Sequence, residues 1–111
     1  MNIQIIGTKK CRETRKAERF FKERGIKFQT LDLKEKGLAK GELRSILSKV
    51  SLDDLINTEA PLYKKKFAYM DFDAEEELLE HPELLRTPIV RSEGRVSIGN
   101  VPALWKSWLE N

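Results

Sequence analysis

The sequence predicts an α/β fold with the element order β-α-β, a helical insert, and β-β-α. Residues 2–6 are apolar and β-branched, which indicates a short buried strand, and residues 26–33 indicate a second strand. The segment between them follows a helical pattern, and a βαβ opening of this kind implies that the two strands are parallel. Leucines at helical spacing follow in the middle of the chain, and a hairpin pattern comes near its end.

The first helix is predicted over residues 11–24. Thr14, Ala17, Phe20 and Phe21 recur at spacings of three and four, which places them on one apolar face. Gly25 follows the last helical residue and is a typical helix C-cap.

The middle of the chain, about residues 38–82, is predicted to be a helical insertion of three or four short helices. Breaks in the leucine pattern fall near Ser51, Pro61 and Asp71. Ser51 followed by Asp54 resembles a capping box, although Asp replaces the better Glu.

The last third predicts a hairpin and a final helix. Residues 88–91 and 95–98 indicate two strands joined by a turn at residues 92–94. Asn100 is expected to cap the following helix, and Pro102 suits its first turn, where an N–H has no helical partner. We expect one side of this helix to carry four apolar residues, Val101, Leu104, Trp105 and Trp108, with the two tryptophans in the core.

Composition excludes several classes of protein. The chain has 111 residues, 40% of them hydrophobic and 35% charged, which predicts a single domain over residues 1–111 rather than a disordered or membrane protein. The first residues show neither a basic start nor a cleavage site, so we expect a cytoplasmic protein. The net charge of +3 is mild and interleaved, so no direct nucleic-acid binding is expected. The runs at residues 64–66 and 71–77 are interpreted as solvated helix ends or loops.

Cysteine and histidine are scarce in this sequence. Cys11 is the only cysteine, so neither an intramolecular disulfide nor a cysteine-rich zinc site can form. His81 is the only histidine, and we interpret it as a surface residue at a helix end. The sequence implies no metal and no cofactor, although glutathione could serve as a cosubstrate.

Cys11 lies where the loop after the first predicted strand meets the first predicted helix. The start of a helix carries partial positive charge and free N–H groups, and both favour a thiolate over a thiol. Lys9, Lys10, Arg12 and Arg15 surround the cysteine in sequence and are expected to act in the same direction. The competing interpretation is a small apolar residue that merely fills space at the helix start.

Thr14 takes the place that a resolving cysteine would hold in a Cys-x-x-Cys pair. Its hydroxyl can only hydrogen-bond to the thiolate. Any disulfide formed by Cys11 is therefore intermolecular, with glutathione, another protein or a second copy of the chain.

Three segments together resemble the arsenate reductase-like family, which includes the ArsC, Spx and YffB proteins. They are residues 6–11 followed by 16–17, residues 84–90, and residues 95–99. The resemblance implies a thioredoxin-like fold with a four-stranded mixed sheet. It also implies that the Thr87-Pro88 bond is cis, that Pro88 faces the cysteine, and that the backbone of Thr87 can pair with a bound thiol partner.

The sequence departs from the family members that reduce arsenate. Those enzymes hold the oxyanion with arginines, and the matching places here are Thr87, Asn57 and residues 98–99, with the nearest arginine displaced to Arg86. The histidine before the cysteine loop is also missing. Because an oxyanion needs fixed cationic donors, little or no arsenate reductase activity is expected.

Three functions stay open at this point. The first is a thiol oxidoreductase linked to glutathione or a protein thiol, with Cys11 as nucleophile and with Arg86, Thr87 and Pro88 among the partner-binding residues. The second is a transcription regulator of the Spx type that binds RNA polymerase, although the Cys-x-x-Cys pair usual in those proteins is absent. The third is an interaction module that kept the fold without the chemistry.

Overall fold

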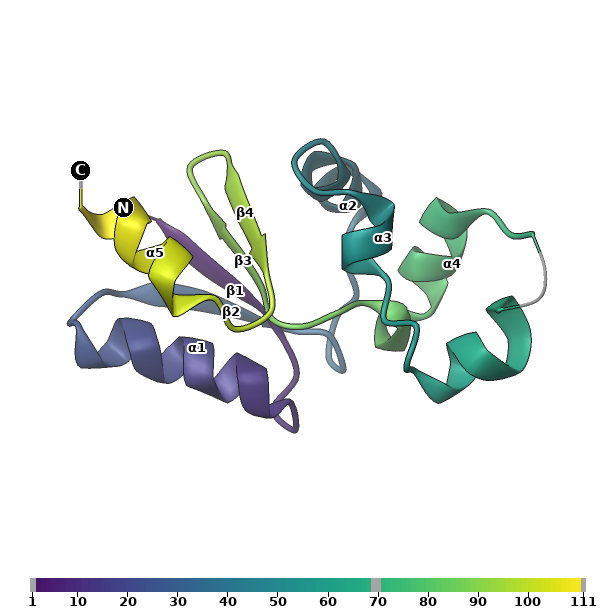
Figure 1. Cartoon of the computed structure of the whole chain (residues 1–111), viewed down its shortest axis with the longest axis horizontal. Helices are drawn as coiled ribbons and strands as arrows, with labels where there is room; N and C mark the ends of the chain where they lie inside the picture. The colour runs from purple at the N-terminus through teal and green to yellow at the C-terminus, as the bar shows by residue number, and fades with distance from the viewer. Residues whose placement is uncertain (1, 69–70, 111) are drawn as a thin grey trace.

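The computed structural model describes residues 2–68 and 71–110. Its centre is a four-stranded mixed sheet with the strand order β2-β1-β3-β4 (Figure 1). Strand β1 (Ile3–Gly7) pairs in parallel with β2 (Phe28–Asp32) and antiparallel with β3 (Ile89–Ser92), which pairs antiparallel with β4 (Arg95–Ile98). The predicted α/β fold and mixed sheet are confirmed.

Two helices cover one face of the sheet, α1 (Arg12–Glu23) and α5 (Pro102–Leu109). Side chains alternate between the faces of a strand, so Ile3 and Ile5 point to this side and Ile6 to the other. The buried residues of this layer share one apolar cluster, made of Ile3, Ile5, Ala17, Phe20, Phe21, Val90, Trp105 and Trp108. The predicted apolar face of the first helix is therefore confirmed.

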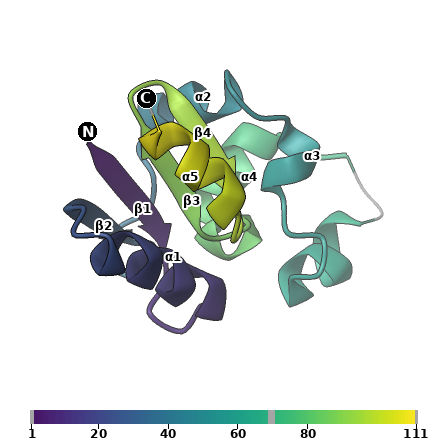
Figure 2. The ribbon, with the colours of Figure 1, turned by 60° about the vertical axis from the view of Figure 1, so that its left-hand side comes forward.

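The segment between β2 and β3 is helical, and its helices lie beside one end of the sheet (Figures 1 and 2). It contains α2 (Lys40–Leu47), α3 (Leu52–Leu55), the π-helical turn η1 (Tyr63–Phe67), α4 (Ala74–Glu80) and the 3₁₀ turn η2 (Pro82–Leu84). Their apolar residues join Ile6 and Ile89 in a second buried cluster on the opposite face of the sheet. The helical interpretation of the leucine spacing is confirmed.

Two predicted helix ends agree with the structure. Gly25 adopts a φ of 69°, a left-handed conformation that suits glycine directly after a helix. The Ser51 hydroxyl accepts a hydrogen bond from the backbone N–H of Asp54 at 3.2 Å, so Ser51 caps α3 as expected.

The turn of the hairpin is shorter than predicted. Ser92 belongs to β3, and the chain reverses over Glu93 and Gly94, whose φ angles are 50° and 83°. Two successive positive φ angles are typical of the tight turn that matches the twist of paired strands. The predicted three-residue turn is wrong by one residue for this reason.

One prediction for the last helix is wrong. Asn100 does not cap it, because α5 begins at Pro102 and the N-cap position falls on Val101, which has no side-chain acceptor. Leu104 belongs to the predicted apolar side but is 43% exposed, whereas Trp105 and Trp108 are buried against the sheet. The placement of both tryptophans in the core is confirmed.

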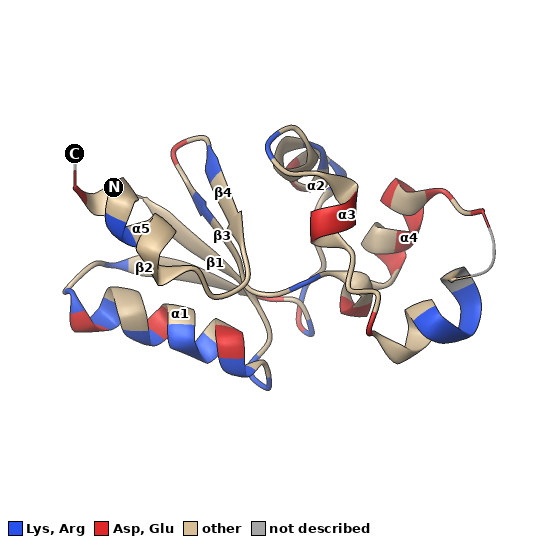
Figure 3. Cartoon of the chain, viewed as in Figure 1, with Lys and Arg blue, Asp and Glu red and all other residues tan. Residues whose placement is uncertain are grey.

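Figure 3 shows where the charged residues lie along the chain. Basic and acidic residues are interleaved along α1, whereas residues 64–66 form a basic stretch and α4 is largely acidic. Lys64, Lys65 and Lys66 are exposed, in line with their interpretation as a solvated run. Among the described residues, no helix is long and apolar enough to cross a membrane.

Candidate functional site

Cys11 is the N-cap residue of α1. Its backbone is extended, with φ −78° and ψ 116°, and its carbonyl accepts the first helical hydrogen bond from the N–H of Arg15 at 3.1 Å. The loop before it is closed by a hydrogen bond from the N–H of Cys11 to the carbonyl of Thr8, also at 3.1 Å. This conformation holds the half-buried thiol at the N-terminal end of the helix, where backbone N–H groups have no helical partners.

The segment that precedes β3 meets this thiol from the other side. Because β3 pairs with β1, with Ile89 opposite Ile6, the two residues before β3 lie next to the loop that follows β1. The Thr87-Pro88 bond is cis, as the resemblance implied, and Pro88 is fully buried. The hydroxyl of Thr87 donates a hydrogen bond to Sγ of Cys11 at 3.0 Å.

The surroundings of Cys11 favour its thiolate. Burial raises the pKa of the thiol. Four hydrogen bonds to the sulfur outweigh this effect and lower the pKa below its ordinary value; they come from the hydroxyls of Thr14 and Thr87 and from the backbone amides of Thr14 and Glu13. The two hydroxyls differ in geometry. Thr87 makes a full hydrogen bond, whereas the buried Thr14 hydroxyl makes none of ordinary geometry within the described residues. Thr87 is therefore the better-defined donor.

The four cations around Cys11 in sequence are exposed. Lys9 forms a 3.8 Å ion pair with Glu35, in which both side chains are largely exposed. The lowered pKa of Cys11 comes from hydrogen bonds, and no charge of Lys10, Arg12 or Arg15 is among its causes. A contribution of these four residues to the thiolate or to substrate binding stays a prediction.

Replacing Thr87 with valine is expected to raise the pKa of Cys11 and slow its alkylation at neutral pH. The substitution keeps the shape of the side chain and removes the hydroxyl that donates to Sγ. The rate of alkylation by iodoacetamide against pH measures this change. Thr30→Val, an exposed change on β2, is the matched control and should not shift the pH at which the alkylation rate rises. An unchanged profile for Thr87→Val would show that its hydroxyl does not stabilise the thiolate.

Gly7 fixes how closely α1 approaches the sheet. A Cβ added at Gly7 would overlap the side chain of Thr14 in the first turns of α1. Gly7→Ala is therefore expected to reduce the free energy of unfolding by about 1–3 kcal/mol, the usual cost of overpacking. Gly41→Ala on α2 is the control, because the added methyl group meets nothing there and alanine favours a helix, so stability should rise slightly. Urea unfolding compares the two, and equal effects would contradict the close contact.

A cleft of about 650 Å³ opens beside the thiol. One wall comes from the insert and the other from β4 and the start of α5. Its polar lining residues are Cys11, Asp53, Asp54, Asn57, Arg86, Thr87 and Ser97, and its apolar ones are Val50, Val96, Ile98, Gly99, Val101 and Leu104. The thiol thus faces a space that another molecule can enter.

The positions that the resemblance matched to the arginines of arsenate reducers meet in this one cleft. Thr87, Asn57 and residues 98–99 all line it, and none of them is cationic. Arg86 lines it too, but its Nε donates to the carbonyl of Ile56 at 3.0 Å, which ties the side chain to the insert. Within the described part of the chain, the cleft therefore lacks the cluster of arginines that would surround an oxyanion.

Asp53, Asp54 and Leu104 are cleft residues that the sequence did not relate to the site. The sequence pattern indicates only a capping role for Asp54 and a place on the apolar side of the last helix for Leu104. Nothing in their local pattern relates them to Cys11, because the cleft is formed by segments far apart in the chain.

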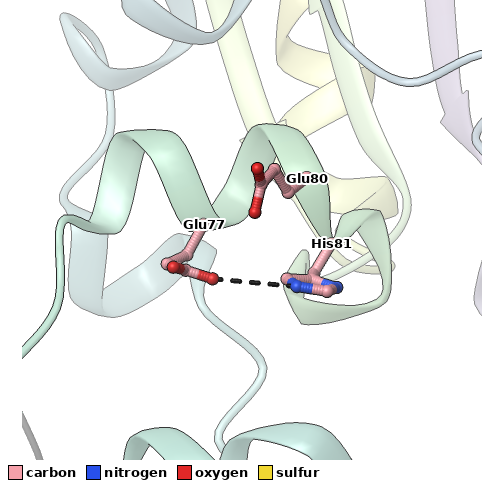
Figure 4. Close-up of side chains that lie close together, drawn as sticks. All are labelled: Glu77, Glu80 and His81. Carbon is pink, nitrogen blue, oxygen red and sulfur yellow. Dashed lines mark ion pairs between the residues drawn. The ribbon is translucent and has the colours of Figure 1, made fainter.

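His81 lies at the C-terminal end of α4, as its interpretation predicts, and is half-buried (Figure 4). It pairs with Glu77 at 3.8 Å and with Glu83 at 3.6 Å. Glu77, Glu80 and His81 each offer one atom that could bind a metal, and these three atoms lie within 4.8 Å of one another. This group belongs to the insert and does not line the cleft at Cys11.

The model of the ArsC family matches residues 6–107 of this chain. The chain belongs to the ArsC family. Among characterised relatives, it is 32% identical over 105 residues to the global transcriptional regulator Spx 2 of Oceanobacillus iheyensis, covering 89% of this chain and 77% of that protein. It is 31% identical over 107 residues to the global transcriptional regulator Spx of Streptococcus pyogenes serotype M1, covering 87% of this chain and 77% of that protein.

Solved structures of the family have the same fold. The arsenate reductase from Vibrio cholerae superposes with a TM-score of 0.81 at 24% identity, covering 96% of this chain and 97% of that one. An arsenate reductase-related protein from Brucella melitensis gives a TM-score of 0.73 at 25% identity, covering 100% and 97%. A glutaredoxin from Archaeoglobus fulgidus still aligns with a TM-score of 0.51 at 11% identity, covering 98% and 86%. The fold is thus thioredoxin-like, as the resemblance implied.

Proposed function

We propose that this ArsC-family protein is a thiol–disulfide oxidoreductase with Cys11 as its single nucleophile. The observation that carries the proposal is the hydrogen bond of 3.0 Å from the Thr87 hydroxyl to Sγ of Cys11, at the mouth of a cleft large enough for a partner. A hydrogen bond to the ionised sulfur lowers its pKa, and the thiolate is the form that attacks disulfides.

In the proposed reaction, the Cys11 thiolate attacks one sulfur of a partner's disulfide. A bond forms between Cys11 and that sulfur, the partner's own disulfide breaks, and its second sulfur leaves as a thiolate. Since Thr14 stands where a resolving cysteine would be, a second thiol from outside, glutathione or a protein thiol, must attack the mixed disulfide and release Cys11. The thiols carry out every step, so the reaction requires neither a metal nor a cofactor.

Arsenate reduction is not part of this proposal. An arsenate bound beside Cys11 would need several cationic donors, and the cleft presents Thr87, Asn57 and Gly99 at the places expected to supply them. We therefore expect no arsenate-dependent oxidation of glutathione above background.

Mass spectrometry and turnover test the proposal together. The reduced protein is mixed with a model disulfide, and the mass of one mixed disulfide on Cys11 is sought. Turnover is then followed with excess glutathione as the resolving thiol. The proposal expects both the adduct and repeated turnover. Failure to form an adduct would reject it, and an adduct without turnover would leave a thiol that binds partners but does not catalyse.

A transcription regulator of the Spx type is the second candidate, and the two Spx relatives are the observation that favours it. RNA polymerase is then the expected partner, and capture of purified polymerase by the immobilised protein tests this. Binding that persists in Cys11→Ser, without thiol turnover, would favour the regulator. A cytoplasmic location suits both candidates, because thiols are kept reduced there.

A further inference from the structure

The cleft at Cys11 has an acidic wall and an apolar wall. We propose that its partner is a polypeptide whose cysteine lies beside an apolar residue and a lysine or arginine, and that the cleft disfavours glutathione as the first partner. This inference rests on the proposed thiol chemistry and specifies its substrate class. It concerns the rate at which a partner first reacts with Cys11; glutathione in excess can still release Cys11 afterwards, because a high concentration offsets a slower attack.

The acidic wall consists of Asp53 and Asp54 on α3, the red part of that helix in Figure 3. Both side chains are exposed, and neither forms an ion pair within the described part of the chain. Two unpaired carboxylates at the rim of a cleft attract a cation and repel an anion.

Positive charge near the cleft does not cancel this wall. Arg86 is the cation among the described lining residues, and it is held to the carbonyl of Ile56. Two carboxylates against one guanidinium leave the described lining with a net negative charge. Lys9, Lys10, Arg12 and Arg15 precede or lie on α1 and do not line the cleft.

The opposite wall is apolar. Val96 and Ile98 from β4 line it together with Val101 and Leu104 at the start of α5. Leu104 is 43% exposed and is the exposed large hydrophobic side chain among the described residues. An apolar side chain of the partner that covers Leu104 would remove both surfaces from water, which stabilises the complex.

Glutathione fits this cleft poorly on charge. It carries two carboxylates and one ammonium group around its cysteine and has no large apolar side chain. Its carboxylates would approach Asp53 and Asp54, and nothing in it would cover Leu104. A peptide with an apolar residue and a lysine beside its cysteine matches both walls.

Single-turnover exchange tests this preference. Each probe is a thionitrobenzoate mixed disulfide: a leucine-containing cysteine peptide with lysine flanks, the same peptide with glutamate flanks, and glutathione. The Cys11 thiolate forms a disulfide with the peptide sulfur and releases coloured thionitrobenzoate. At low ionic strength we expect the lysine peptide to react on the order of tenfold faster than the glutamate peptide or glutathione, and added salt should reduce the ratio.

Variants assign the preference to the acidic wall. The ratio of lysine-peptide to glutamate-peptide rates is measured within each variant, so a change in the Cys11 thiolate itself cancels. Asp53→Asn with Asp54→Asn should bring the ratio toward one. Glu23→Gln, an exposed change at the far end of α1, is the control and should keep the wild-type ratio.

The outcomes separate this inference from the proposed function. If glutathione or the glutamate peptide reacts as fast as the lysine peptide, the charge preference is wrong while the thiol chemistry stands. If the ratio survives removal of both acids, Asp53 and Asp54 are not its cause and the inference fails. If no probe reacts, the proposed oxidoreductase fails and this inference fails with it.

Discussion

Cys11→Ser is expected to reduce thiol–disulfide exchange to the rate of the buffer alone. The chain has one cysteine, so no other residue can form a disulfide with a partner. A serine hydroxyl remains protonated at neutral pH and cannot take the role of the thiolate. Release of thionitrobenzoate from a model disulfide measures the effect directly, and wild-type protein alkylated with iodoacetamide should behave in the same way.

The fold should survive this substitution. Serine is close to cysteine in size, and Cys11 lies half-buried at the start of α1 rather than in either core cluster. Urea unfolding should therefore place Cys11→Ser near the wild type. Exchange that continued in a folded Cys11→Ser protein would contradict the assignment of Cys11 as the nucleophile.

Trp105→Ala is expected to reduce the free energy of unfolding by about 3–5 kcal/mol, the usual range for a large aromatic residue removed from a core. Trp105 is fully buried, and its ring lies 5.2 Å and 5.4 Å from the rings of Phe20 and Phe21. Its indole N–H donates to the hydroxyl of Ser97 at 2.8 Å, and Ser97 would lose that donor inside the protein. Urea unfolding followed by circular dichroism measures the loss.

Leu104→Ala provides the control on the same helix. Leu104 precedes Trp105 but is 43% exposed, so its truncation should change the free energy of unfolding by no more than about 1 kcal/mol. Similar losses for the two variants would contradict the placement of Trp105 in the core and Leu104 at the cleft.

Local patterns were sufficient to predict most of the fold. The spacing of Ala17, Phe20 and Phe21 defined the buried face of α1, because a helix in contact with a sheet buries one stripe. At α5 the pattern did not separate the exposed Leu104 from the buried Trp105, because both are apolar and adjacent. A helix so short shows little periodicity, and the sheet surface decides which apolar side chains turn inward.

The site was predicted only in part. The position of Cys11 at the N-terminus of α1 could be predicted from the helical pattern that follows it. The family resemblance implied the cis bond before Pro88, which the structure brings close to Cys11. The hydroxyl of Thr87 lies 76 residues away in sequence from the sulfur to which it donates, a separation that no local pattern can bridge. Asp53 and Asp54 reach the cleft for the same tertiary reason.

The pH dependence of Cys11 alkylation tests the proposed chemistry most directly. The rate follows the thiolate fraction, and Thr87, Thr14 and the first amides of α1 lower the pKa of this thiol despite its partial burial. We expect the midpoint of the rate profile to fall below about 8.5, the value of an unperturbed cysteine. A midpoint at or above that value, or no alkylation until the protein is unfolded, would contradict an activated thiolate and leave a binding module.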